Sequence, residues 1–247
     1  MVQSMEDGAP GHRKGVGCHG MSMSDRINAR AKSRSEKTDE LRKRIMEEAL
    51  KLFIEQGYEK TTTRQIIQKS GILNGSLYNI YKGKDDIFVG IVNRALTEAV
   101  ALMDECLGPA PAPEQAMCFP TCIQIYASAR SPRIAELLAV AHEKWSICRN
   151  AIVFYKQWLD DNKTNWASIL DDPNLDLRIA AFSGSLGSMM KMMAEEPGAV
   201  SEHDCMKVMC EMNLSMFNMR CEDIDAFVEH ITHEFESREI VICDIRI

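Results

Sequence analysis

The sequence lacks the segments that mark membrane-spanning and secreted proteins. None of its apolar runs reaches the roughly 18 residues that a membrane-spanning helix needs. The N-terminal stretch MVQSMEDGAPGHRKGVGCHG contains basic residues, but no apolar core follows them as it would in a secretory signal. We therefore expect a cytoplasmic protein without a membrane partner.

The sequence also lacks the cysteine pattern of a disulfide-bonded or zinc-binding protein. Nine cysteines are an odd number, and a reducing compartment keeps thiols free. His203, Cys205 and Cys210 lie close together, and Cys118 and Cys122 share a helix face, but neither group has the CxxC or HxxxH spacing of a zinc site. No feature positions a catalytic nucleophile. We expect buried packing cysteines, no metal, no cofactor and no enzymatic activity.

An excess of basic residues is absent overall but present in the first part of the chain. The formal net charge is -7. Residues 1–90 contain 16 Lys and Arg against 12 Asp and Glu, a net charge of +4, so the remainder carries -11. A basic end on an acidic body indicates a protein that binds nucleic acid through one part of its chain.

Composition and pattern divide the chain into three parts. Residues 1–37 are rich in Gly, Ser, Met and charge and have almost no large apolar residues, which predicts a disordered basic arm. Basic side chains between residues 26 and 37 contact phosphates in one interpretation, and in the other the arm is merely solvated. Residues 38–90 are expected to form a DNA-binding domain, and residues 91–247 a helical effector-binding and dimerisation domain.

The second part begins with the pattern of two helices. Apolar residues recur at helical intervals from Leu41 to Phe53, and Gly57 follows where a helix-ending glycine belongs. Thr62 and Gln65 have the spacing of a capping box, which predicts that a short second helix starts there.

The third helix begins at an ambiguous dipeptide. Asn74-Gly75 is a signal for a β-hairpin turn, but no alternating strand pattern lies on either side of it. Gly71 ends the second helix, and the residues from Leu77 to Tyr81 continue at helical spacing. The sequence therefore predicts a helix-turn-helix unit, whose third helix fits the major groove of DNA.

This unit resembles the DNA-binding domain of the TetR family of bacterial transcriptional regulators. EALKLFIEQGYEKTT and IIQKSGILNGSLYNIYKGKDDI match the family's alanine-phenylalanine helix, its G(Y/F)xxTT and its IAxxAGVSxGxLYxxFxxKxxL, from Leu41 to about Leu96. The departures from this pattern are Ile67 in place of an alanine, Leu73 in place of the serine before the third helix, and Tyr81 in place of the final phenylalanine. Because the Leu73 side chain accepts no hydrogen bond, we expect capping to pass to Asn74.

The resemblance implies a set of DNA contacts. Thr62 and Thr63 would cap the second helix and touch a phosphate, and Lys84 would grip the backbone beyond the third helix. The implied DNA-binding residues are Arg42, Thr62, Thr63, Asn74, Gly75, Ser76, Tyr78, Asn79, Tyr81 and Lys84. For Tyr78 and Tyr81 the alternative is that they are core aromatics.

The remainder of the sequence predicts an all-α fold. A long amphipathic helix, KDDIFVGIVNRALTEAVALMDECL, leads away from the helix-turn-helix unit, and the tail EIVICDIRI looks strand-like. Further helices are expected at about 133–160, 174–195, 201–219 and 222–238. In the TetR family the last two common helices pair between subunits. The resemblance therefore implies a homodimer through 174–195 and 201–219, bound to a near-palindromic double-stranded DNA operator.

The body is also expected to bind a small apolar or aromatic effector. The expected pocket lies against the C-terminal half of the long helix and is lined by Met103, Cys106, Cys122, Tyr126, Trp145 and Met189. These features predict a sequence-specific transcriptional regulator that acts as a ligand-released dimeric repressor. Oxidation of Cys106 and Cys122 is the rival trigger. The alternative functions are a metal- or thiol-based sensor or enzyme on the helical body, and an architectural DNA-binding factor without effector.

Overall fold

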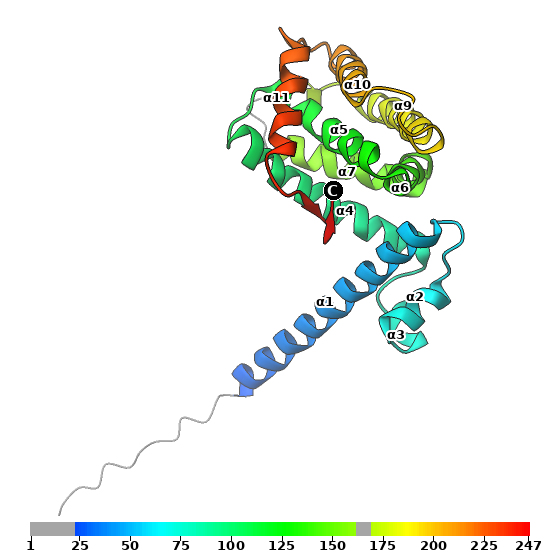
Figure 1. The fold of residues 1–247 in the computed structure, drawn as a ribbon. Coiled ribbons are helices and arrows are strands. Elements are labelled where there is room, and N and C mark those ends of the chain that lie inside the picture. Colours follow the sequence, from blue (N-terminus) through cyan, green and yellow to red (C-terminus); the bar gives the residue numbers. More distant parts are fainter. Residues whose placement is uncertain (1–22, 162–168) are drawn as a thin grey trace, which may run out of the picture. The chain divides into compact units, whose positions relative to one another are not determined.

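The protein folds into α-helices and one two-stranded sheet, as Figure 1 shows for the computed structural model, which describes residues 23–161 and 169–247. In chain order the elements are α1 (Met23–Gln56), α2 (Thr63–Ser70), α3 (Asn74–Tyr78), α4 (Lys84–Leu107), α5 (Pro113–Arg130), α6 (Pro132–Glu143), α7 (Trp145–Asp161), α9 (Leu175–Glu195), α10 (Glu202–Met216), α11 (Ile224–Glu236), β1 (Val241–Ile242) and β2 (Ile245–Arg246). The expected all-α class is confirmed. Within the described ranges, no helix is both long enough and apolar enough to cross a membrane.

The first helix starts earlier than the sequence indicated. α1 begins at Met23, whereas apolar periodicity placed its start near Leu41. The arm expected over residues 1–37 is thus helical from Met23 onward, and the part before it lies outside the described residues. Arg, Lys and Ala are frequent between residues 26 and 37, and their high helix propensity favours continuation of the helix in this direction. Of the described residues, those up to Leu41 belong to one unit and those from Arg42 onward belong to another.

Residues 42–83, called the head below, form the helix-turn-helix unit. α1 ends before Gly57, whose φ of 88° suits glycine, and α2 ends at Gly71 in the left-handed conformation. The Thr62 hydroxyl accepts from the Gln65 backbone N–H, and the Gln65 side chain accepts from the Thr62 N–H. The predicted glycine caps and capping box are therefore confirmed. The head is built around side chains that are at most 1% exposed, namely Ile45, Ala49, Phe53, Ile66 and Leu77.

α3 differs from the prediction at both ends. Leu73 is its N-cap and provides no side-chain hydrogen bond, and Asn74 is the first helical residue, so the expected cap at Asn74 is absent. The helix ends at Tyr78, and the N–H of Tyr81 donates to the Leu77 carbonyl at 2.8 Å in a closing turn. Without a side-chain cap, the short helix depends on packing, because Leu77 is fully buried beneath it.

α4 runs without interruption from the head into the helical body, over the range that the sequence predicted. Asp85 and Asp86 lie in its first turn, where acidic groups oppose the positive end of the helix dipole. Phe88 packs edge-on against Phe53 of the head, with ring centroids 5.4 Å apart. At the other end of α4, Met103 belongs to the core of the body.

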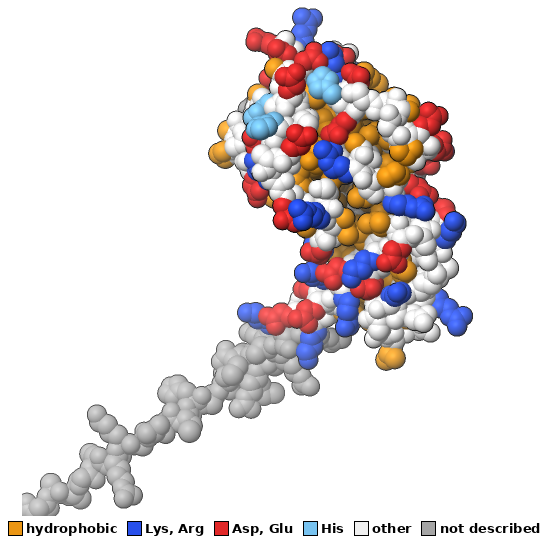
Figure 2. All heavy atoms as spheres, viewed as in Figure 1, with side chains coloured by type: hydrophobic (Ala, Val, Ile, Leu, Met, Phe, Trp, Pro, Cys, Tyr) orange, Lys and Arg blue, Asp and Glu red, His pale blue; other side chains and the backbone are white. Residues whose placement is uncertain are grey.

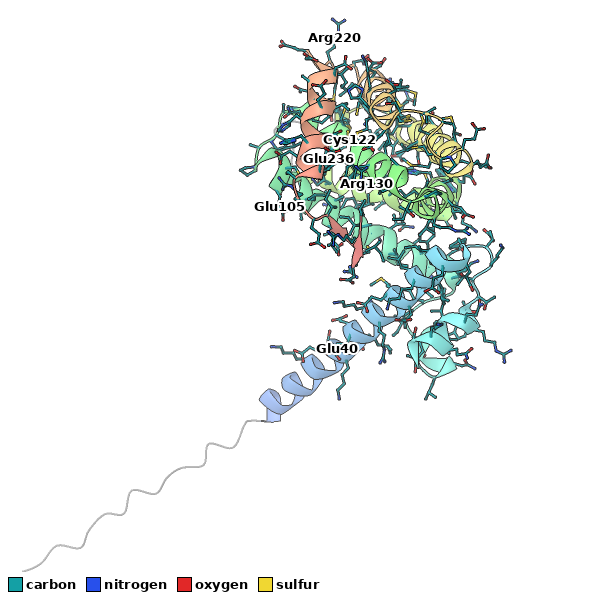
Figure 3. All side chains as sticks on the ribbon, in the orientation of Figure 1. Glu40, Glu105, Cys122, Arg130, Arg220 and Glu236 are labelled. Carbon is teal, nitrogen blue, oxygen red and sulfur yellow. The ribbon has the colours of Figure 1, made fainter. Side chains whose placement is uncertain are left out.

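The body, from α4 to α11, is organised around α5. This helix packs against α4, α6, α9, α10 and α11. Cys122 of α5 is fully buried among these helices, whereas Glu105 and Arg220 point outward (Figure 3). Arg130 at the end of α5 pairs with Glu202 of α10 at 2.9 Å. The helices expected at 174–195, 201–219 and 222–238 correspond to α9, α10 and α11.

The helix expected at about 133–160 is divided into α6 and α7. Lys144 ends α6 with an extended backbone, φ -77° and ψ 108°. No Gly or Pro marks this break in the sequence. The Lys144 ammonium lies 3.6 Å from Glu59 and 3.8 Å from Asp85, so the break places a cation of the body against acidic side chains of the head and of the first turn of α4.

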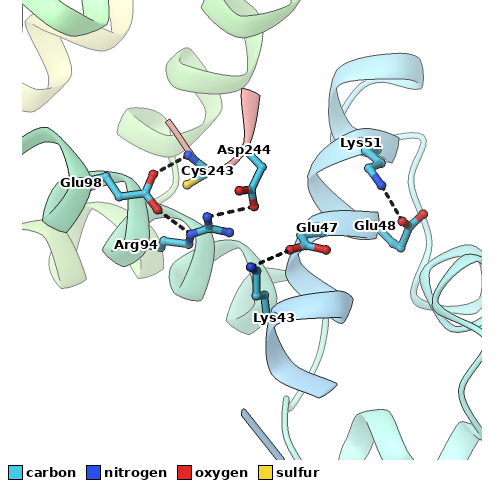
Figure 4. Close-up of polar contacts among 8 residues, drawn as sticks. All are labelled: Lys43, Glu47, Glu48, Lys51, Arg94, Glu98, Cys243 and Asp244. Carbon is cyan, nitrogen blue, oxygen red and sulfur yellow. Dashed lines mark hydrogen bonds and ion pairs between the residues drawn. The ribbon is translucent and has the colours of Figure 1, made fainter. Parts of the chain in front are cut away.

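The strand-like tail forms a hairpin that is fastened to α4. β1 and β2 pair antiparallel, and the turn between them has Cys243 and Asp244 at φ 52° and 62°, as a two-residue type I′ turn requires. The N–H of Cys243 donates to Glu98 at 2.6 Å, and Arg94 pairs with Asp244 at 2.9 Å (Figure 4). Arg94 also bonds Glu98 at 2.7 Å, so one ion-pair network joins two successive turns of α4 to the hairpin.

Replacing Thr62 with Ala tests the capping box. The variant loses the bond from the Gln65 N–H, and the loss of an N-cap costs about 1 kcal/mol of stability. Thr97 is a matched control, because it is exposed within α4, where Ala has the higher helix propensity by about 0.5 kcal/mol. In urea denaturation we expect Thr62→Ala to be less stable than wild type and Thr97→Ala to be as stable or more so. Equal stability of Thr62→Ala and wild type would contradict the role of the cap.

Candidate nucleic-acid interface and ligand cavity

The outer face of α3 collects five of the residues expected to meet DNA. Asn74, Gly75, Tyr78 and Asn79 are exposed and Ser76 is partly exposed. Tyr78 exposes 58% of its area, so the core alternative does not apply to it. A face made of amide, hydroxyl and phenol groups can donate to and accept from base edges in the major groove.

Tyr81 lies inside the head. Its side chain is 9% exposed, and its ring faces Gly90 of α4, where an added Cβ would lie 3.5 Å away. Burial raises the pKa of the Tyr81 phenol. The structure therefore supports the core alternative for Tyr81 rather than a contact with DNA, because the closing turn after α3 points the ring inward.

Three of the expected phosphate contacts lie at the surface. Arg42 is exposed on α1, Thr62 is exposed, and Thr63 is partly exposed at the start of α2. The Thr62 hydroxyl is already engaged in the capping box. The contacts of these three residues with DNA stay predictions.

Lys84 is engaged within the protein. Its ammonium donates to the Tyr58 carbonyl at 2.8 Å and lies 4.1 Å from the centre of the Tyr58 ring. Burial lowers the pKa of Lys84. The Tyr58 hydroxyl donates to Asp85, and Lys144 lies over the same ring at 4.9 Å. In this structure Lys84 thus fastens α4 to the head, a role that the sequence pattern did not indicate.

Leu73 is a surface residue. The sequence pattern had marked it only as a position where the side chain that caps the third helix is missing. Leu73 exposes 80% of its area at the start of α3. The replacement of the family's serine by Leu73 is the sequence feature that could have indicated this site. An exposed leucine beside a helix in the major groove can contact a thymine methyl group. Arg64, Lys69 and Lys82 are also exposed in the head, and Figure 2 shows basic side chains around this part of the molecule.

Two cavities lie among the described residues of the unit that begins at Arg42. The larger, of about 170 Å³, is bordered by α4, α5, α6, α7, the C-terminal hairpin and the end of α1. The smaller, of about 80 Å³, is bordered by α5, α6, α7, α9 and α10. Within the described part of the chain, no Asp, Glu, Lys or Arg lines either cavity.

None of the residues expected to form the effector pocket lines these cavities. Met103, Cys106, Cys122 and Tyr126 are buried in the core, Trp145 is 60% exposed, and Met189 is partly buried. Large side chains fill the interior here, whereas space remains beside small ones. The small residues bordering the larger cavity include Ala95, Ala99, Ala127, Ala141 and Ala151.

A hydrogen-bonded histidine stands between the cavities. His142 lines both, and its ring nitrogens lie 2.7 Å from the Gln124 side-chain oxygen and 2.7 Å from the Ser183 hydroxyl. One neutral tautomer satisfies both bonds, with Nε2–H donating to Gln124 and Nδ1 accepting from Ser183. Burial lowers the pKa of His142 to about 4. Gly187 of α9 allows this close approach, because an added Cβ there would lie 2.8 Å from the His142 Cβ.

The buried histidine makes stability depend on pH. The unfolded chain gains a proton near pH 6.5 and the folded chain only near pH 4, so stability falls as pH decreases through that window. We expect stability, measured by urea denaturation, to fall less between pH 6.5 and pH 4.5 in His142→Gln than in wild type. His230→Gln, which changes an exposed histidine of α11, should retain the wild-type slope. Equal slopes in all three proteins would contradict the neutral buried state.

Comparison with known proteins agrees with the helix-turn-helix geometry. A sequence profile of the bacterial regulatory proteins of the tetR family matches residues 45–91, which hold α2, α3 and the adjoining parts of α1 and α4. A comparison with curated proteins finds no match.

Several solved structures are similar to this chain. A protein from Syntrophomonas wolfei, described as a TetR-family transcriptional regulator, is 16% identical, with 74% of this chain and 98% of that chain covered and a TM-score of 0.51. RolR, solved without ligand, is 15% identical, with 75% and 95% covered and a TM-score of 0.52. TylP, a tetR regulator from Streptomyces fradiae, is 14% identical, with 82% and 99% covered and a TM-score of 0.50.

At these identities the structures show a shared fold, and the family assignment depends on the matched segment. That segment contains the capped α2, the glycine turn and the exposed face of α3. The match identifies the helix-turn-helix unit as a DNA-binding domain of the tetR family of bacterial regulatory proteins.

Proposed function

We propose that this transcription regulator is a dimeric repressor that a small ligand releases from its operator. The observation that carries the proposal is the exposed polar face of α3 on a head that continues, through one unbroken helix, to an apolar cavity. The face can read bases, and the helix can carry a change in the cavity to that face.

α4 supports the coupling between ligand and head. Ile91, Ala95 and Ala99 of this helix border the larger cavity, while Lys84 at its start bonds the Tyr58 carbonyl of the head. Leu50 of the head borders the same cavity. A ligand there would contact both parts, and it would favour whichever arrangement of head and body leaves it better packed. The shift in DNA affinity cannot exceed the difference in ligand affinity between the two arrangements.

α9 and α10 support the proposed homodimer. Leu177 of α9 and Val208 of α10 expose 70% and 51% of their areas, and Ala181 and Gly184 are exposed on α9. Small and apolar residues on an outer helix face allow a second copy to approach closely. A two-fold symmetric pair of subunits would then present two heads to two operator half-sites.

A thiol switch is the second candidate trigger, and one contact favours it. The sulfur atoms of Cys122 and Cys210 lie 3.5 Å apart, joining α5 to α10, whereas Cys106 is not its partner. Both thiols are fully buried. Hydrogen bonding to Cys210 raises the pKa of Cys122, and hydrogen bonding to Cys118 and Cys122 lowers the pKa of Cys210. Because neither sulfur atom is accessible to an oxidant, the ligand trigger is preferred.

An architectural DNA-binding factor remains the alternative to a repressor. Such a factor needs no effector, whereas this fold keeps a cavity without acidic or basic side chains beside the helix that leads to the head. An empty apolar space of this size lowers the stability of the free protein, and a bound ligand would offset that cost. The cavity therefore favours the ligand-responsive regulator.

Substitution on α3 tests the DNA-binding proposal. The operator is first selected from a random-sequence pool by the wild-type protein. Asn74→Ala removes one amide from the exposed face, and a lost base contact costs about 1–3 kcal/mol, so we expect about 5- to 150-fold weaker binding. Asn150→Ala, which changes an asparagine of α7, is the matched control and should bind as wild type. Equal binding by both variants would contradict the assignment of α3.

Substitution on α10 tests the dimer. Val208→Lys should yield monomers in sedimentation, because a lysine in the interface would lose its hydration without gaining a partner. Val153→Lys makes the same change at an apolar residue of α7 that is 61% exposed, and it should leave the dimer intact. A wild-type dimer in the Val208→Lys variant would remove this face of α10 from the interface.

A further inference from the structure

The two cavities meet at one set of side chains. Gln124, His142, Ala151 and Tyr155 border both of them, together with Pro120 and Cys148. The spaces are therefore neighbours across a common boundary. A ligand long enough to occupy both would pass these residues.

Tyr155 stands at this boundary, and its ring packs against Phe154 with centroids 6.0 Å apart. Its hydroxyl makes no hydrogen bond with any of the described residues, and burial raises the pKa of its phenol. The neighbouring polar groups are paired, since His142 bonds Gln124 and Ser183, and Gln124 donates to the Pro120 carbonyl at 2.9 Å. Tyr155 is only partly exposed and borders both cavities, so a ligand atom bound there could accept a hydrogen bond from its hydroxyl.

The lining has no acidic or basic side chain to offer a ligand. Neither cavity is bordered by Asp, Glu, Lys or Arg within the described residues, and His142 is neutral near pH 7 because burial lowers its pKa to about 4. An ionised carboxylate or ammonium would lose its hydration there without an opposite charge. The site therefore disfavours charged ligands of otherwise suitable shape.

We propose that the effector is an uncharged molecule with two apolar ends and a hydrogen-bond acceptor, such as a ketone or ester carbonyl, between them. Its larger end fills the space beside α4 and the hairpin, its shorter end extends toward α9, and the carbonyl accepts from the Tyr155 hydroxyl. The proposal rests on the ligand-responsive function above, and it adds the ligand class and the residue that selects it.

The cavity volumes suggest a probe. A cavity of about 150 Å³ lined by aliphatic and aromatic side chains holds benzene. The larger space, of about 170 Å³, is similar in volume and should therefore hold a phenyl ring. The smaller space of about 80 Å³ suits a short alkyl chain. Butyrophenone has a phenyl ring, a carbonyl and a propyl chain in this order. Butylbenzene lacks the carbonyl, and 4-phenylbutanoate carries a charge.

Calorimetric titration of the free, full-length protein with these three compounds tests the proposal. Wild type should bind butyrophenone most tightly, butylbenzene more weakly and 4-phenylbutanoate least. In Tyr155→Phe we expect butyrophenone binding to weaken by about 2- to 10-fold, the value of one net hydrogen bond, with butylbenzene unaffected. Tyr126→Phe is the matched control, because Tyr126 is a buried tyrosine that borders neither cavity, and it should bind all three compounds as wild type.

Three results would overturn the proposal. In the first, butyrophenone binds no more tightly than butylbenzene. In the second, the carboxylate 4-phenylbutanoate binds most tightly, and in the third, none of the three compounds binds. Equal weakening by Tyr155→Phe and Tyr126→Phe would also overturn the role of Tyr155. The titration contains no DNA, so it is independent of the operator test. Loss of DNA recognition with intact ketone binding would contradict the repressor and leave the ligand site standing.

Discussion

The anchoring of α4 at both of its ends is the constraint on which the rest of the structure depends. Its first turns pack into the head through Phe88, and its last turns enter the core of the body through Met103. Between them no Pro interrupts the helix. A stiff element that is buried at both ends cannot absorb a displacement within itself. Movement at the cavity must therefore be passed to the head or resisted by the whole unit.

Local chemistry explains why the head was predictable from the sequence. The capping box at Thr62 and the glycine at Gly71 act over a few residues, so their spacing alone places α2. The same reasoning failed where tertiary contact decides. Leu73 left α3 uncapped, and burial of Leu77, which is not visible in local spacing, holds the helix in place. The break at Lys144 likewise follows from contacts with the head rather than from a helix-breaking residue.

The DNA-facing residues and the cavity also differ in how far the sequence could predict them. The exposed face of α3 follows from helix phase within one short segment, and five expected residues lie there. The cavity combines elements from α1 to the C-terminal hairpin, and no sequence interval encodes their meeting. The aromatic and sulfur-containing residues that were expected to line the pocket mostly lie in the core, because such side chains pack tightly there. Tyr155, which borders both cavities, has no sequence feature that distinguishes it from the other tyrosines, because its position depends on how α7 packs against α4, α6 and α9.

The hairpin has a consequence for how the chain acquires its structure. Its bond from Cys243 to Glu98 joins residues 145 positions apart, and contacts of such long range form late because closing the intervening loop costs entropy. Until then, the apolar flank of α4 that faces the hairpin has no cover. Proteolytic nicking just before β1 would leave the same flank open to water in the folded protein. Such a cleaved protein would tend to self-associate through α4, even though its head remained able to fold.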